Sequence, residues 1–110
     1  MGGLQNRFDN DEVKSFWAFH YECLICNENG WDALHHILSP TSQGFVKGKH
    51  NTSILNSCPI HNVKCHLYNP SLKRREKELL KIVLRLTKNK GYELNEKDIQ
   101  FLTVYKKFYA

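Results

Sequence analysis

The chain has 110 residues, which is enough for one domain with a modest hydrophobic core. It carries 16 Lys and Arg against 11 Asp and Glu, has no stretch long and apolar enough to span a bilayer, and lacks the apolar run of a secretion signal. We therefore expect a cytoplasmic protein with no membrane segment. In a reducing compartment its four cysteines favour metal binding, whereas in an exported protein disulfides would have to be considered.

The positive charge is distributed unevenly. Residues 1–32 hold two basic and six acidic side chains, residues 33–70 hold three and none, and residues 71–91 hold eight and two. A local basic region of this kind favours a polyanionic partner, because neutralising phosphates releases counterions. A solvated helix face explains the run at 71–91 equally well when that run is taken alone.

The first part of the chain predicts an arm and two strands. Residues 1–14 are polar and predict an N-terminal arm or a short amphipathic lead-in. Residues 15–25 are rich in aromatic and β-prone types, which favours a strand that ends in Cys23-x2-Cys26. Residues 27–30, Asn-Glu-Asn-Gly, predict a turn, and residues 31–38 predict a second strand that carries His35 and His36.

The rest of the chain predicts helices after a basic loop. The loop, residues 39–51, contains Lys47 and Lys49, and residues 52–55 form a short β-prone piece. A helix is expected over 59–68, because proline is favoured in a first helical turn. Further helices are expected from residue 71 to about 91 and from 96 to 108. The chain is thus expected to be a single α+β domain, with a core at 15–68 and a helical extension at 69–110.

Two short ligand pairs predict a structural zinc site. Cys23 and Cys26, like Cys58 and His61, are separated by two residues, so each pair can aim both ligands at one point. Two such pairs satisfy the tetrahedral coordination of Zn²⁺. The alternative is that Cys58 is a buried apolar thiol and His61 a surface residue. Cys65 is expected to belong to the core.

A second group of polar residues predicts a more open metal site. Asn62 and His66 are four residues apart, so on a helix they share one face. His35 and His36 point to opposite sides of a regular strand, but a strand end or bulge lets both line one cleft. A sparse set of imidazole and amide ligands leaves positions on a divalent cation open for water and phosphate oxygens. An isolated histidine such as His20 or His50 is expected to be a surface or packing residue.

Taken together, these motifs resemble one nuclease family. His35-His36-Ile37, the Asn-containing stretch 51–55 and Cys58-Pro59-Ile60-His61-Asn62 with His66 resemble the HNH, or His-Me finger, nucleases. The likeness is strongest to the versions with a zinc knuckle, including the phage endonuclease VII type, and it covers residues 23–68. It implies a small zinc-stapled ββα-metal core, here with two additional C-terminal helices.

The resemblance also implies a reaction and a role for individual residues. Family members use Mg²⁺ or Mn²⁺ to hydrolyse DNA strands, leaving 5'-phosphate and 3'-hydroxyl ends. His36 matches the general base, and His35, Asn62 and His66 match the positions that bind the cation or the scissile phosphate. The family's middle Asn, which orients the base, falls at Ser53 by spacing; Asn51 and Asn56 flank it, and we favour Asn51 as the catalytic residue. Asn62 stands where the family usually has His, which weakens the ligand set.

The sequence therefore supports three functional hypotheses. The first is a DNA endonuclease that acts on duplex or branched DNA. It would act in the cytoplasm, which is that of a host cell if the protein is phage-encoded. A homodimer is expected if both strands are cut together. Its nucleic-acid contacts would come from basic residues of the loop and the first long helix: Lys47, Lys49, Lys73, Arg74, Arg75, Lys77 and Lys81. The second is a zinc-stabilised nucleic-acid-binding module without catalysis. The third, a toxin or inhibitor that acts through protein contacts, rests only on Tyr105 and Tyr109.

Overall fold

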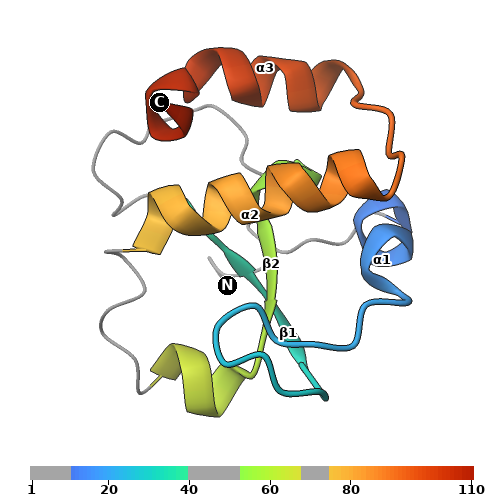
Figure 1. Cartoon of the computed structure of the whole chain (residues 1–110), viewed down its shortest axis with the longest axis vertical. Coiled ribbons are helices and arrows are strands. Elements are labelled where there is room, and N and C mark those ends of the chain that lie inside the picture. The colour runs from blue at the N-terminus through green and yellow to red at the C-terminus, as the bar shows by residue number, and fades with distance from the viewer. Residues whose placement is uncertain (1–10, 40–52, 68–74) are drawn as a thin grey trace, which may run out of the picture.

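The computed structural model of the chain describes residues 11–39, 53–67 and 75–110. In chain order its elements are helix α1 (Asp11–Trp17), strand β1 (Ala33–His36), 3-10 helix η2 (Ile54–Asn56), strand β2 (Ser57–Ile60), π-helix η3 (Asn62–Leu67), helices α2 (Glu76–Asn89) and α3 (Glu96–Val104), and 3-10 helix η5 (Lys106–Tyr109). Helices thus surround a small sheet, which confirms the expected α+β class (Figure 1).

The sheet is an antiparallel pair of strands, β1 and β2, with a continuous register. His35 lies opposite Cys58, and His36 lies opposite Ser57. Directly opposed residues share a face of a sheet, and successive residues alternate between its faces. His35 therefore shares one face with Cys58, and His36 shares the other with Ser57. The Ser57 hydroxyl accepts a hydrogen bond from the Trp17 indole at 2.6 Å, so the face with His36 is the one that α1 approaches.

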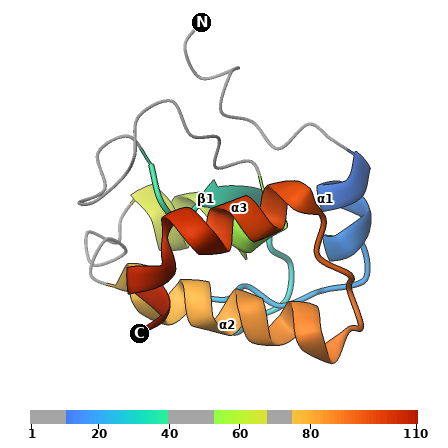
Figure 2. The same ribbon diagram turned by 90° about the horizontal axis from the view of Figure 1, so that it is seen from above.

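The hydrophobic core gathers around η2, which α1, α2 and α3 all contact. Ile54, Leu55 and Asn56 are fully or almost fully buried, because this single turn lies where the three helices meet. Figure 1 shows α2 crossing the sheet, α3 beyond one end of the sheet and α1 to one side, and Figure 2 shows α2 and α3 as two separate helices whose axes have roughly the same direction. The helices, with the residue that follows α3, add further large buried side chains to the core: Trp17, Leu79, Leu80, Val83 and Tyr105.

The expected strand at 15–25 is wrong, because residues 11–17 form helix α1 and the only β pairing within 15–25 is the isolated bridge between Glu22 and Asn29. Val13 and Trp17, four residues apart, are its buried residues, and Asp11 and Glu12 occupy the first turn, where acidic side chains suit the helix dipole. The core contact of this helical face outweighs the β propensity of the aromatic residues. The boundary expected between residues 14 and 15 also falls inside α1.

The expected helix at 59–68 is also shorter than predicted. Residues 57–60 form strand β2, and the helix begins only at Asn62. Pro59 does not start a helix; it lies opposite Leu34, and its carbonyl accepts a hydrogen bond from the Leu24 amide at 3.0 Å. The β-prone piece at 52–55 is likewise wrong for Ile54 and Leu55, which belong to η2.

The two C-terminal helices are confirmed within the described residues. α2 ends next to Lys90 and Gly91, and Gly91 has a φ of 70°, which favours glycine after a helix. The last helix, expected to continue to Phe108, ends at Val104 and is followed by the separate turn η5. Over the ranges that the structure describes, no helix has the length and apolar character needed to cross a membrane.

Candidate metal centre

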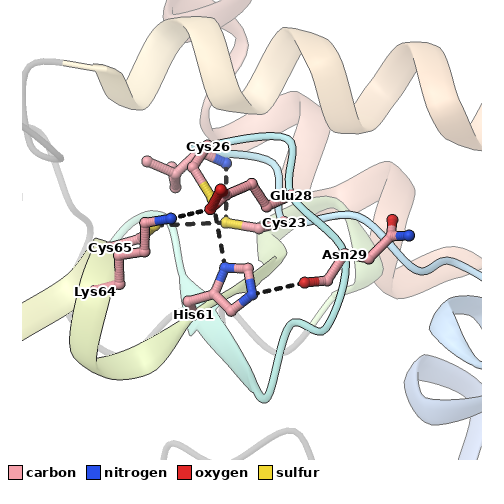
Figure 3. Close-up of polar contacts among 8 residues, drawn as sticks. Cys23, Cys26, Glu28, Asn29, His61, Lys64 and Cys65 are labelled. Atoms are coloured by element: carbon pink, nitrogen blue, oxygen red, sulfur yellow. Dashed lines mark hydrogen bonds and ion pairs between the residues drawn. The ribbon is translucent and has the colours of Figure 1, made fainter.

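Four potential metal ligands converge beside the sheet. The ligand atoms of Cys23, Cys26, His61 and Cys65 all lie within 4.8 Å of one another. Figure 3 shows the two cysteines of the loop at 20–31 facing His61 and Cys65 across a small space. Segments about 40 residues apart in sequence are therefore brought together by one group of side chains that could hold a metal ion such as zinc.

The distances within this group suit tetrahedral coordination. The Sγ atoms of Cys23 and Cys65 are 3.7 Å apart, and Cys26 Sγ is 3.4 Å from His61 Nδ1. Zn–S and Zn–N bonds of ordinary length at tetrahedral angles place two sulfurs about 3.8 Å apart and a sulfur and a nitrogen about 3.6 Å apart. Three thiols and one imidazole are also the donor types that favour zinc over hard cations.

A tight turn aims the first two ligands. The Cys23 amide donates to the Glu28 carbonyl at 2.9 Å, and the Asn27 amide donates to the Cys23 carbonyl at 2.9 Å. Asn27 has a φ of 64°, a left-handed conformation that Asn adopts more readily than most residues. The tight turn therefore spans residues 23–27, earlier than the turn expected at 27–30, and Asn29 instead pairs with Glu22 in an isolated β-bridge. This turn brings Cys26 close to Cys23.

The start of η3 presents the other two candidate ligands, because His61 lies directly before this helix and Cys65 lies within it. His61 and Cys65 are four residues apart, and the Cys65 amide donates to the His61 carbonyl at 2.9 Å, so both side chains leave the same side of the turn. The start of η3 is held by Asp32, whose Oδ1 accepts from the Asn62 amide at 2.8 Å. A carboxylate there satisfies an amide that the helix leaves unpaired.

A hydrogen bond also orients the His61 ring. Its Nε2 lies 3.0 Å from the Asn29 carbonyl oxygen, so Nε2 carries the hydrogen and donates it (Figure 3). Nδ1 is then left with its lone pair directed at the sulfurs. Metal-binding histidines commonly fix their tautomer through such a contact of the other ring nitrogen.

The thiols of this centre differ in acidity. Although burial raises the pKa of Cys23, backbone hydrogen bonds at Cys26, Ile25 and His61 outweigh it and hold that pKa at about 6. Burial, with the nearby Cys23 and Cys26, raises the pKa of Cys65 to about 11. Because zinc binds thiolates, ion binding would have to displace the proton from Cys65, and uptake should release protons.

The structure differs from the expected ligand set at one position. Cys58 lies outside the group of four, and Cys65, expected to be a core residue, takes its place. Cys58 belongs to β2 and is fully buried, and burial followed by the charge of Cys23 raises its pKa. The cause is local. Because residues 57–60 form a strand, Cys58 and His61 do not share a helical turn, whereas His61 and Cys65 do.

Near this centre, the structure brings together two of the four groups expected at the second site. The rings of His35 and His66 lie with centroids 4.9 Å apart and an interplanar angle of 62°. Burial, then the charges of His66 and His36, lower the pKa of His35 to about 4, so its imidazole is neutral at pH 7. Two imidazoles at this separation can both offer a nitrogen to one cation.

The other expected groups are placed differently. His36 leaves the opposite face of β1 from His35, and burial lowers its pKa to about 4. Asn62 is exposed at the start of η3. Among the described residues, no second set of three His, Cys, Asp or Glu ligand atoms meets the closeness of the Cys3His group.

The candidate asparagines also separate. Asn51 lies outside the described residues, whereas Asn56 is fully buried beside β1. Its side-chain oxygen accepts from the Leu38 amide at 2.8 Å, and its amide donates to the Leu38 carbonyl at 3.0 Å. Asn56 therefore fixes the backbone two residues after His36.

Of the basic residues expected to contact nucleic acid, only some lie within the described residues. Lys47, Lys49, Lys73 and Arg74 lie outside the described residues. Lys77 and Lys81 are exposed on α2. Arg75 is engaged by Glu78, with contacts of 3.2 Å and 2.9 Å to its two carboxylate oxygens.

The sequence did not identify Cys65 as a candidate metal ligand, and it favoured Asn51 over Asn56. Cys65 could have been found from its spacing of four from His61, and Asn56 from its place directly before the second strand. Comparison of the chain with protein-family models, curated proteins and solved structures finds no match. The functional argument therefore rests on the residues of the site.

Proposed function

We propose that the chain is a zinc-stabilised, metal-dependent endonuclease of the HNH type that hydrolyses phosphodiester bonds of DNA. The observation that supports this most directly is the contact between His35 and His66, at 4.9 Å between ring centroids. It joins the strand and the helix that the resemblance assigns to the catalytic centre. The helix of that contact also carries Cys65 and directly follows His61.

In this proposal the Cys3His group binds a structural zinc ion. Zinc there ties the loop at 20–31 to η3 and so fixes the helix from which His66 projects. On η3, Asn62 and His66 are each one residue after a zinc ligand, which rotates them by roughly a quarter turn from His61 and Cys65. One short helix can thus serve two sites.

The second site would hold a divalent cation through His35, His66 and Asn62. The two imidazoles fit such an ion because they are adjacent, and His35 is neutral at pH 7. An imidazole-rich set suits Mn²⁺, Ni²⁺ or Zn²⁺ better than Mg²⁺. When bound, the cation stabilises negative charge that develops on the phosphate and the leaving oxygen.

His36 would accept a proton from the attacking water. Its imidazole is neutral at pH 7 because burial lowers its pKa to about 4, and a neutral imidazole has one ring nitrogen whose lone pair can accept a proton. Asn56 would act as a positioning residue, since its two hydrogen bonds to Leu38 hold the chain that follows His36.

A plasmid-nicking assay with zinc-loaded protein tests the proposal. Wild-type protein should nick plasmid with added Mg²⁺, Mn²⁺ or Ni²⁺, and His36→Ala should reduce the rate by about 100-fold or more, because general-base catalysis contributes about 10²–10⁴-fold. Zinc content and DNA affinity should not change. His50→Ala, at a histidine with no assigned role, is the control. Undiminished cutting by His36→Ala would reject the assignment.

The second candidate is a zinc-stabilised nucleic-acid-binding module without catalysis. It is favoured by the continuous strand register, which directs His35 and His36 to opposite faces of the sheet. Wild-type protein that binds DNA and zinc but leaves plasmid intact with every metal tested would support this candidate instead.

A further inference from the structure

The outward face of α2 carries cations that neither metal site uses. Lys77, Lys81, Arg85 and Lys88 are all exposed. At about 100° per residue, these four positions fall within an arc of about 80°. The buried residues of α2, Leu79, Leu80, Val83 and Thr87, fall on the opposite side. We call the four cations the α2 basic arc.

No acidic side chain of α2 lies within this arc. Glu78 stands at its edge, but the Arg75 guanidinium holds both of its carboxylate oxygens, at 3.2 Å and 2.9 Å. Glu76 lies toward the buried side. The Lys81 ammonium donates one hydrogen bond to the Ala110 carbonyl at 3.1 Å and keeps two further donors. Among the side chains of α2, the arc therefore presents charges of one sign.

This arrangement does not favour the helix itself. Lys77 and Arg85 each lie four residues from Lys81, and like charges at that spacing destabilise a helix by about 0.2–0.5 kcal/mol per pair. Lys77 also stands in the first turn, where the helix dipole disfavours a cation. A surface needed only for solubility would mix charges of both signs along such a face.

We propose that the α2 basic arc is a binding surface for the phosphate backbone of nucleic acid, separate from the metal sites. The inference rests on the proposed action on DNA and names the part of the chain that holds the substrate. From residue 77 to residue 88 the arc extends about 17 Å, which corresponds to about five nucleotide steps along one strand of a duplex. The arc contacts phosphates without reading bases, so it anchors DNA of any sequence.

The salt dependence of DNA binding tests this surface. The experiment uses the full, zinc-loaded chain and a short duplex without added divalent cation, so that no cleavage occurs. Each phosphate contact contributes about −0.9 to the slope of log K against log salt concentration. Lys81→Gln with Arg85→Gln should make the slope shallower by about 1.8 and weaken binding on the order of 50-fold at 0.1 M salt.

The matched control is Lys14→Gln with Lys97→Gln, which removes the same charge from exposed positions on α1 and α3. Its slope should equal that of the wild type. The proposal would be overturned if all three proteins had equal slopes, or if both double variants lost the same amount of DNA affinity. It would also be overturned if Lys81→Gln with Arg85→Gln weakened binding to anionic lipid vesicles but not to DNA. Circular dichroism verifies that each variant is folded.

The outcomes also separate this surface from the proposed nuclease. A chain that binds with the expected slopes but cuts no DNA rejects the nuclease and retains the arc. A chain that cuts DNA while both double variants bind like the wild type rejects the arc and retains the nuclease.

Discussion

At the scale of single residues, Cys58 and Cys65 show how closely a ligand set depends on local backbone. Both thiols are buried, and each is near enough to Cys23 for its charge to affect their pKa values. Only Cys65 lies on the same helical turn as His61 and belongs to the group of four. Cys58 lies three residues before His61 and Cys65 four residues after it, so spacing alone allows either cysteine to be the fourth ligand. Because residues 57–60 form a strand, only Cys65 shares a helical turn with His61.

Zinc content separates the two cysteines experimentally. Cys65→Ser should lose the bound ion, because one of four ligands is removed, whereas Cys58→Ala should retain one zinc per chain. The measurement is metal content after dialysis, with release followed by a colorimetric chelator. Zinc lost from Cys58→Ala but kept by Cys65→Ser would establish the ligand set predicted from the sequence and refute the one described.

Asn56 shows a second effect at this scale. An asparagine in sequence is ambiguous, because it suits turns, caps and surfaces alike. Asn56 is buried directly before β2, and its side-chain amide group hydrogen-bonds to both the backbone amide and the backbone carbonyl of Leu38. That pairing identifies Asn56 as a residue that orders the segment after His36.

At the scale of elements, α3 is attached to the core through its first turn. Asn95 and Asp98 form a reciprocal capping box, in which each side chain accepts from the other's amide, at 2.9 Å and 3.0 Å. The buried Asp98 carboxylate also accepts from the Ser53 and Tyr92 hydroxyls. One side chain thus both starts α3 and anchors it beside η2.

Asp98→Ala should therefore destabilise the protein by about 2 to 4 kcal/mol, because it leaves several donors buried without an acceptor. The measurement is the free energy of unfolding in urea with zinc present. Gln100→Ala, at an exposed position of the same helix, should change it by no more than about 0.5 kcal/mol. An Asp98→Ala variant as stable as this control would show that the network adds nothing.

Helix α1 shows the limit of propensity at this scale. Its aromatic residues favour a strand when they are counted, but Val13 and Trp17 match the spacing of a helix face. Trp17 gains full burial and a hydrogen bond to Ser57 from the helical arrangement. Tertiary contact therefore decides the conformation of a segment whose local preference is weak.

At the scale of the whole molecule, the described sheet has only two short strands, and the loop at 20–31 packs beside it through few large side chains. A two-stranded sheet is marginal by itself in water. The Cys3His group joins this loop to η3, so metal binding and folding of this half of the molecule should be coupled.

Removal of the metal should therefore lower the melting temperature by about 10 °C or more, since each kcal/mol lost shifts it by about 4–8 °C in a domain of this size. The measurement is thermal unfolding by circular dichroism with and without a strong zinc chelator, followed by zinc addition to restore the transition. Mg²⁺ added to the chelated protein is the control and should restore nothing. A melting temperature insensitive to the chelator would exclude a structural metal.

Some features of this protein follow from its sequence alone. The α+β class, the strand around His35, a turn that includes Asn27, the two C-terminal helices and three of the four candidate ligands, Cys23, Cys26 and His61, were all predictable. Each depends on a local pattern, such as helical periodicity, a Cys-x2-Cys spacing or a turn sequence, and local patterns are written within a few consecutive residues.

Other features were decided only by the tertiary structure. The start of η3 after β2, the choice of Cys65 over Cys58, the role of Asn56 and the opposite directions of His35 and His36 depend on strand register and on burial. The reason is physical: a shift of one residue in register reverses which face a side chain leaves, and burial against distant segments determines which polar groups must find partners. Neither quantity can be read from neighbours in the sequence.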